Sequence, residues 1–143
     1  MSRFAVAGEL ILDTGALVTI LDKRQNHHER FVRFFESWEA PIVSTEAVLT
    51  EATHLLGTVV GGREACIDFY LLGGALLVPA TTAALRRSKE IVRQYADLPM
   101  DYADATLVVL AEELDTNLVF TTDRRDFAIY RIRGRRHFEI LPR

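Results

Sequence analysis

Four acidic residues of this chain stand beside apolar segments, where a carboxylate is uncommon. Asp13 and Asp123 each follow a short apolar run, while Glu51 and Asp104 fall on the apolar side of segments with helical spacing. An ionised carboxylate in such a position is costly unless a positive charge pairs with it. The residue types and their positions therefore indicate a site for a cation.

Carboxylate oxygens are the ligands that Mg²⁺ and Mn²⁺ prefer, and Mg²⁺ is typically held by one or two carboxylates together with water and phosphate. Such an ion polarises a phosphodiester and lowers the pKa of bound water, and two ions ~3.5–4 Å apart can hold both the attacking and the leaving oxygen. Without an ion, clustered acids repel one another, so one or more of them should retain a proton more readily. The pattern predicts metal-assisted hydrolysis of a phosphodiester, provided that the fold brings the four acids together.

The elements that must position these acids are short apolar strands alternating with helices, which is typical of a parallel sheet covered on both faces. Strands are predicted at residues 9–12, 41–43, 75–78, 118–120 and 138–141. Helices are predicted at residues 16–21, 29–38, 45–56, 63–72, 82–97 and 101–114. In this α/β fold Asp13 and Asp123 lie at the same carboxyl edge of the sheet, where ligands bind. On the helix at 101–114, Thr106, Glu112 and Glu113 are predicted to face solvent.

The composition bounds the class of protein. A chain of 143 residues makes a single domain, residues 1–143, that is long enough to bury a core. With 49% hydrophobic and 26% charged residues it is typical of a globular protein and not of a disordered one. No apolar run approaches the ~18–20 residues of a membrane span, and residues 1–8 lack the apolar segment of a signal peptide, so we expect a cytoplasmic protein. The lone Cys66 excludes an internal disulfide and a cysteine metal site.

Positive charge is concentrated at one end of a chain whose formal net charge is -3. Residues 124–143 contain seven arginines against two acids, Asp126 and Glu139, whereas both lysines lie earlier. This distribution predicts a local basic patch beside the acidic site.

Four segments, taken in order, resemble the PIN-domain nucleases, and most of all the VapC-type toxins of bacterial and archaeal toxin–antitoxin pairs. The segments are LDTGAL at 12–17, VLTE at 48–51, ADATL at 103–107 and TTDRRDF at 121–127. Each motif alone is weak, but the ordered set is specific and the similarity covers nearly the whole chain. The resemblance implies a PIN-like three-layer α/β/α fold with a central, mostly parallel five-stranded sheet. It also implies an endoribonuclease that depends on Mg²⁺ or Mn²⁺.

The resemblance assigns roles to individual residues. The positions that match the family's acidic quartet, and would hold the metal directly or through water, are Asp13, Glu51, Asp104 and Asp123. Thr121 matches a hydroxyl residue commonly found two positions before the last acid. Asp101 matches a less uniform position and would assist. Many VapC-type toxins have asparagine where this chain has Asp123, and the aspartate favours metal binding.

The resemblance also implies partners. VapC-type toxins usually form homodimers, cut RNA, and are inhibited by an antitoxin whose tail lies along a groove and reaches the acidic site. We expect the apolar helices around residues 31–38 and 48–56 to line that groove. The arginines expected to hold RNA phosphates, with an affinity that falls as salt rises, are Arg124, Arg125, Arg131 and Arg133.

Several of these features also suit simpler roles. Asp101 suits a helix N-cap, and Asp13 suits a turn before Thr-Gly. The aromatic stripe at residues 31–38 suits the hydrophobic core, and the arginines suit a solvated basic tail. The case for a shared site therefore depends on all four acids and not on any one of them.

Other enzyme classes lack a residue that they need. A haloacid dehalogenase-like phosphatase requires a second acid two residues after the first, where this chain has Gly15. A response-regulator receiver requires a late lysine, but the last lysine is Lys89, and the chain has no P-loop motif. Two alternatives stay open. One is a non-catalytic PIN-like module that binds RNA or protein, and the other is a housekeeping RNA-processing nuclease.

Overall fold

A computed structural model of the chain describes residues 8–143. Its centre is a five-stranded sheet in the order β3-β2-β1-β4-β7, in which every pair of neighbours is parallel. The strands are β1 (Leu10–Leu12), β2 (Ile42–Thr45), β3 (Leu76–Val78), β4 (Leu118–Phe120) and β7 (Glu139–Leu141). The predicted parallel sheet is confirmed, with each strand within two residues of its predicted bounds.

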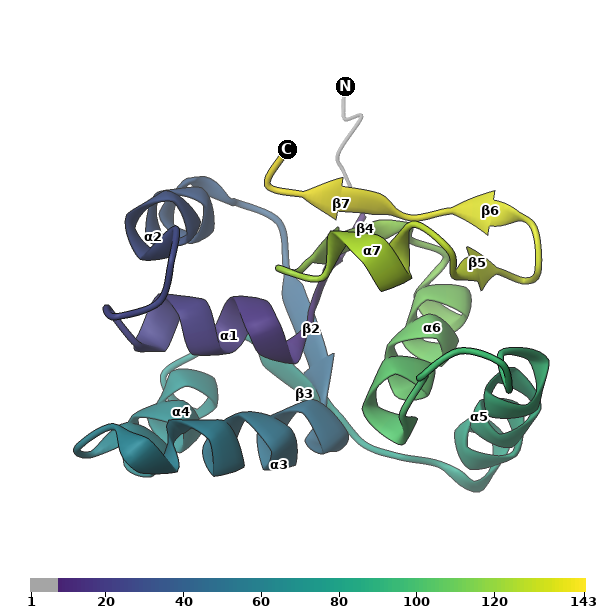
Figure 1. The fold of residues 1–143 in the computed structure, drawn as a ribbon, viewed down its shortest axis with the longest axis horizontal. Helices are drawn as coiled ribbons and strands as arrows, with labels where there is room; N and C mark the ends of the chain where they lie inside the picture. The colour runs from purple at the N-terminus through teal and green to yellow at the C-terminus, as the bar shows by residue number, and fades with distance from the viewer. Residues whose placement is uncertain (1–7) are drawn as a thin grey trace.

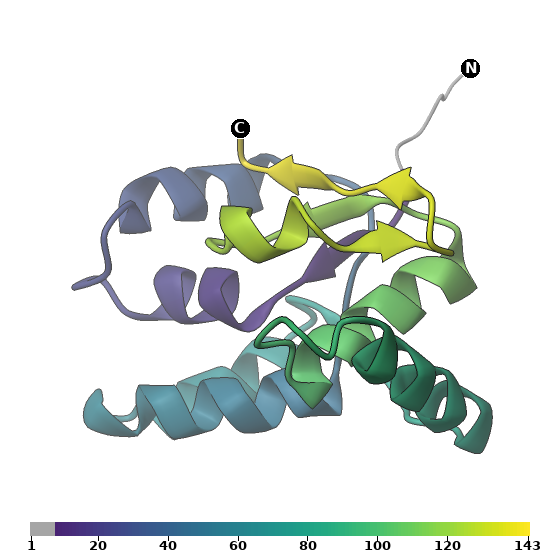
Figure 2. The same cartoon turned by 45° about the vertical axis from the view of Figure 1, so that its right-hand side comes forward.

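Helices flank the sheet on both sides. They are α1 (Thr14–Leu21), α2 (His28–Ser37), α3 (Glu46–Leu55), α4 (Gly62–Leu71), α5 (Thr82–Gln94), α6 (Tyr102–Leu114) and the short α7 (Arg124–Phe127). A 3-10 turn, η1 (Leu56–Thr58), joins α3 to α4. Helices α1 to α4 lie on one side of the strands and α5 and α6 on the other (Figure 1). After a 45° turn, α5 and α6 still lie side by side (Figure 2). The layers are those of the predicted α/β/α fold.

The aromatic stripe of α2 packs into the core. The ring centroid of Phe31 lies 5.4 Å from that of Phe120 in β4, and the Phe34 ring lies 4.9 Å from the same ring. Phe35 contacts Phe69 of α4 in a similar way, at 5.4 Å. The helical spacing therefore identified an inward face correctly, with Phe31 buried and the rings of Phe34 and Phe35 partly buried against the core.

Strand β3 is more exposed than its apolar sequence predicts. The relative solvent-accessible surface is 63% for Leu76 and 40% for Leu77. The reason is the strand order, because β3 pairs with β2 on one side only and forms an edge of the sheet. An apolar run indicates a strand, but it does not reveal whether that strand is central.

The segment after β4 contains a helix and a hairpin that the sequence did not reveal. Helix α7 spans four residues, and β5 (Arg131–Ile132) and β6 (Arg136–His137) form a separate antiparallel pair. Their turn places Arg133 and Gly134 at φ values of 51° and 71°. Such turns are usually signalled by Asn-Gly or Asp-Gly, so Arg-Gly between two-residue strands gives little warning.

Within residues 8–143, no helix is long and apolar enough to cross a membrane. The expectation about a signal peptide falls largely on residues 1–7, which lie outside the described residues. Cys66 is buried in the core, where it serves packing.

Glu112 of α6 was predicted to face solvent, but it is buried, with 9% of its surface exposed. Arg87 of α5 donates from Nε to Glu112 Oε1 at 2.9 Å and from Nη2 to Oε2 at 3.0 Å. The N–H of Arg133 also donates to Oε2, at 2.9 Å. Burial alone would raise the pKa of Glu112, but these hydrogen bonds outweigh it and hold that pKa below its usual range. Glu112 therefore ties α5 and the β5–β6 hairpin to α6.

Replacing Glu112 by alanine is expected to lower the free energy of unfolding by about 2 kcal/mol, because the guanidinium of Arg87 and the N–H of Arg133 lose their acceptor. Urea denaturation measures the change. The matched control is Glu113→Ala, since Glu113 is the exposed neighbour on the same helix. This control should stay within about 0.5 kcal/mol of the wild type. Equal effects of the two substitutions would contradict a structural role for the hydrogen bonds that Glu112 accepts from Arg87 and from the N–H of Arg133.

Candidate active site

Two of the predicted acids lie at the point where the strand order reverses. Strand β1 leads towards β2 and β3 on one side, while β4 and β7 lie on its other side, so the crevice between β1 and β4 is the switch point of the sheet. Asp13 directly follows β1, and its N–H donates to the carbonyl of Phe120, the last residue of β4, at 3.0 Å. Asp123 follows three residues after β4. The sheet topology therefore brings these two carboxylates to one edge.

Thr121 connects the first and the last acid. Its Oγ1 donates a hydrogen bond to Asp13 Oδ2 at 2.6 Å and accepts one from the N–H of Asp123 at 2.8 Å. Asp13 and Thr121 are both buried, with 6% and 1% of their surfaces exposed. One hydroxyl thus orients the Asp13 carboxylate and fixes the backbone that carries Asp123.

Gly15 allows the start of α1 to approach the loop after β4. A Cβ atom at this position would lie 2.1 Å from Thr122 Oγ1, which is a severe overlap, so no side chain fits there without movement. The neighbouring Thr14 uses its hydroxyl to donate to Glu51 Oε1 at 2.6 Å. The third acid, from α3, is therefore connected to the residue that follows Asp13.

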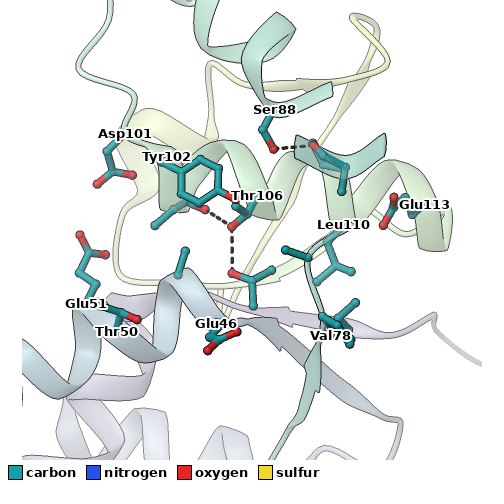
Figure 3. A pocket seen from close by; sticks show the side chains of 17 residues that line it. Glu46, Thr50, Glu51, Val78, Ser88, Asp101, Tyr102, Thr106, Leu110 and Glu113 are labelled. Atoms are coloured by element: carbon teal, nitrogen blue, oxygen red, sulfur yellow. Dashed lines mark hydrogen bonds between the residues drawn. The ribbon is translucent and has the colours of Figure 1, made fainter. Parts of the chain in front are cut away.

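Asp104 reaches the site from the first turn of α6. Asp101 is the N-cap of this helix, and its Oδ1 accepts a hydrogen bond from the Asp104 N–H at 2.9 Å. The hydroxyl of Tyr130 donates to Asp104 Oδ2 at 3.0 Å. Asp101 thus has the capping role that its position suggested, and its side chain also points across the mouth of a cavity towards Glu51 (Figure 3).

The acids perturb one another. Burial raises the pKa of Asp13 to about 6, and the charges of Asp123 and Glu51 add to the rise, while hydrogen bonds from Thr121 and Thr14 oppose it. Burial also raises the pKa of Asp104 to about 7, with further contributions from the charges of Asp101, Asp13 and Asp123. Within residues 8–143, no salt bridge involves any of the four predicted acids. The cluster therefore holds negative charge that no lysine, arginine or histidine of this region neutralises by an ion pair.

The donor chemistry of the cluster fits a hard divalent cation, since it offers carboxylate and hydroxyl oxygens. In residues 8–143, no three histidine, cysteine or acidic side chains are arranged so that they could hold one ion together. An ion that keeps several of its own waters needs only one or two carboxylates directly. Asp13 and Asp104 are the carboxylates best suited to contact such an ion directly, because both are desolvated and neither has a cationic partner within residues 8–143.

A cavity of about 580 Å³ opens beside the acids, between α3, α5 and α6. Val78, Pro79 and Leu110 contribute to its apolar lining, and acidic side chains line it as well. These acids are Glu46, Glu51, Asp101 and Glu113. Two of its lining residues, Thr45 and Thr106, share a hydrogen bond between hydroxyls that lie 2.9 Å apart. Glu51 and Asp101 belong to this lining and connect the cavity to the acidic site.

Most of the arginines proposed as phosphate contacts also bind the chain itself. Arg131 donates from Nη1 to the carbonyls of residues 128, 129 and 130. Arg133 donates from Nη2 to the Glu112 carbonyl at 2.8 Å, and Arg124 from Nη1 to the Pro142 carbonyl at 3.1 Å. Arg125 is exposed two residues after Asp123, and no hydrogen bond or salt bridge holds its side chain within residues 8–143.

Sequence reasoning missed two residues that touch the acids. Thr14 lies in the first motif, and its hydroxyl next to Asp13 was a signal that could have been used. Tyr130 gave no such signal, because 26 residues separate it from Asp104 and neither helical nor strand spacing relates them.

Comparison with known proteins places this chain in a family. The model of the PIN domain matches residues 10–133. Ribonuclease VapC26 of Mycobacterium tuberculosis strain ATCC 25618 / H37Rv is 32% identical over 135 residues, which cover 93% of this chain and all of the relative. These matches span both strand-end acids and both helical acids.

Solved structures share the fold at lower identity. VapC20 of M. tuberculosis, a sarcin–ricin loop cleaving toxin, superposes with a TM-score of 0.75 at 16% identity over 81% of this chain and 91% of that one. VapBC2 of Rickettsia felis, bound to a DNA fragment from its promoter, gives a TM-score of 0.66 at 13% identity over 94% and 99% of the two chains. The family match and the shared fold agree, and this chain belongs to the PIN domain family.

Proposed function

We propose that this chain is a metal-dependent endoribonuclease that hydrolyses RNA phosphodiesters and acts as the toxin of a toxin–antitoxin pair. The observation that carries the proposal is the group of acids at the switch point of the sheet, with two raised pKa values and no basic partner in ion-pair contact. Membership of the PIN domain family and 32% identity to a protein named as a ribonuclease support the same activity.

The residues proposed to hold Mg²⁺ or Mn²⁺, directly or through water, are Asp13, Glu51, Asp104 and Asp123. When bound, the ion would lower the pKa of a water molecule and stabilise negative charge on the phosphate. Thr121 would keep Asp13 oriented, and Thr14 would do the same for Glu51, through their 2.6 Å hydrogen bonds. Asp101 would act mainly through the N-cap that sets the direction of α6.

RNA would approach over the loop and helix that follow Asp123. Arg125 is the strongest candidate for a phosphate contact, because it is exposed, follows Asp123 by two residues and has no side-chain hydrogen bond or salt bridge in the described chain. Arg124, Arg131 and Arg133 each donate to carbonyls of the chain itself and would first have to release them. Arg124 is the second candidate, because it would release one hydrogen bond where Arg131 would release three. If the arginines bind phosphates, the affinity for RNA falls as salt rises. An affinity independent of salt would remove them from the proposal.

The cavity beside the acids suits an antitoxin segment better than the α2 helix does. Its apolar lining and its four carboxylates complement an amphipathic peptide with a basic side chain, and they repel RNA phosphates. The R. felis structure named above contains toxin and antitoxin together. Ala80→Glu, at an exposed position of the cavity lining, should weaken antitoxin binding, and unchanged affinity would place the antitoxin elsewhere.

The exposed leucines of the edge strand β3 are the surface we propose for homodimer formation.

Cleavage of transfer and ribosomal RNA fragments by purified, antitoxin-free protein tests the proposed activity. Discrete cuts are expected with Mg²⁺ or Mn²⁺, and none with EDTA, because the ion supplies the activated water. Cleavage that continues unchanged in EDTA would contradict metal dependence. Metal binding without cleavage of any RNA would favour a non-catalytic module. A cleaving protein whose expression leaves growth unaffected would favour housekeeping RNA processing.

A further inference from the structure

Tyr130 reaches the acidic site from outside the four sequence motifs. It lies between α7 and β5, its side chain is fully buried, and its hydroxyl donates to Asp104 Oδ2 at 3.0 Å. Among residues 8–143, this is the one hydrogen bond that the Asp104 carboxylate accepts. A buried phenol needs a hydrogen-bond partner, and a bond to an ionised carboxylate is stronger than one between neutral groups.

The ring of Tyr130 is held from several directions. Its edge-to-face contacts with Phe127 and Tyr95 have centroid distances of 5.3 and 5.2 Å. The Tyr130 N–H donates to the carbonyl of Asp126 at 3.1 Å, and the N–H of Arg131 donates to the Tyr95 hydroxyl at 2.8 Å. The backbone on both sides of the ring is therefore fixed, so the hydroxyl is in position before any ligand arrives.

Asp104 needs such a donor because its neighbours repel it. The charges of Asp101, Asp13 and Asp123 all act against its ionised form. A half-buried carboxylate under this repulsion lowers its energy by turning towards solvent, away from the other acids. The hydrogen bond from Tyr130 opposes that rotation, and it engages one carboxylate oxygen while the other accepts no hydrogen bond from residues 8–143.

We propose that Tyr130 is a positioning residue that holds Asp104 in the orientation needed to bind a divalent ion. The inference rests on the proposed metal-dependent function. Carboxylates that bind metals are themselves hydrogen-bonded, and loss of such a supporting partner typically costs 10–100-fold in metal affinity. A tyrosine that only filled space would be replaceable by phenylalanine without any effect on metal binding.

Isothermal titration of the full-length, metal-free protein with Mn²⁺ tests the proposal without relying on activity. Tyr130→Phe keeps the ring and removes the hydroxyl, and we expect Mn²⁺ affinity to fall about 10-fold while the circular dichroism spectrum stays native. The matched control is Tyr70→Phe, which removes a buried tyrosine hydroxyl on α4 that makes no hydrogen bond to any of the acids within residues 8–143. Its Mn²⁺ affinity should equal that of the wild type.

Two further measurements separate positioning from packing. In an Asp104→Asn background, Tyr130→Phe should cause no additional loss of Mn²⁺ affinity, because its partner is already changed. RNA cleavage by Tyr130→Phe should recover when Mn²⁺ is raised about 10-fold. Wild-type Mn²⁺ affinity in Tyr130→Phe, or an equal loss in Tyr70→Phe, would overturn the role of Tyr130 and leave the proposed nuclease intact. A wild-type protein that binds no Mn²⁺ would overturn the metal site and this role together.

Discussion

Asp13→Asn is expected to reduce RNA cleavage by at least about 100-fold while making the metal-free protein more stable. The loss of activity follows because Asp13 is the most buried of the four acids and the one that Thr121 orients. Removing a group that stabilises developing charge typically costs about 10²–10³ in rate. The gain in stability follows because burial raises the pKa of Asp13 to about 6, so ionising it at pH 8 opposes folding.

The expected gain for Asp13→Asn at pH 8 is about 2 kcal/mol in the free energy of unfolding, which urea denaturation in EDTA measures. Asp68→Asn is the matched control, since Asp68 is exposed on α4 and should change neither activity nor stability. The opposite directions of the two effects are informative. A variant that lost activity and stability together would show that Asp13 is a structural residue, and an active variant would remove it from the site.

The metal-free protein is expected to lose stability as pH rises from 5 to 8. The pKa values of Asp13 and Asp104 are raised from 3.8 to about 6 and about 7. Between pH 4 and 7 the folded protein therefore binds more protons than the unfolded chain, so the free energy of unfolding falls as pH rises. The fall from pH 5 to pH 8 should be about 3 kcal/mol, after allowance for the partial exposure of Asp104.

Groups with lowered pKa values act at a different pH. Hydrogen bonds from Arg24 lower the pKa of Asp22, and hydrogen bonds from Arg87 and the N–H of Arg133 lower the pKa of Glu112. These two carboxylates therefore contribute stability that is lost only in acid. Above pH 5, the change in the free energy of unfolding with pH is therefore set mainly by Asp13 and Asp104, the two acids with raised pKa values. Thermal melting across this range, with Asp13→Asn and Asp104→Asn as controls, checks the assignment, because each variant should flatten the slope.

A divalent ion should offset part of this loss of stability at high pH. Mn²⁺ at about 100 times its dissociation constant would stabilise the fold by about 2.7 kcal/mol, and by less at pH 5, where protons compete for the same oxygens. The measurement is the shift in melting temperature on adding Mn²⁺ at pH 5 and at pH 8. A shift of equal size at both pH values would place the ion away from Asp13 and Asp104.

The sequence by itself determined the sheet and the place of the strand-end acids. Alternating apolar runs and amphipathic helices force a parallel sheet, and a residue that follows a strand must lie at its carboxyl edge. Asp13 and Asp123 were therefore placed correctly without any knowledge of their neighbours, and so were the inward face of α2 and the N-cap role open to Asp101. These inferences depend only on local spacing.

The tertiary structure alone decided which charged and polar side chains are partners. Glu112 looked solvated because Arg87 and the N–H of Arg133, which allow its burial, come from other elements. The sequence suggested that Arg131 binds RNA, whereas in the fold its guanidinium donates hydrogen bonds to the backbone carbonyls of residues 128–130. Tyr130 reaches Asp104 from the loop between α7 and β5, two elements that local signals did not predict. Desolvation and hydrogen bonding depend on neighbours that are distant in sequence, so the pattern along the chain locates a carboxylate but does not determine its charge state or its partner.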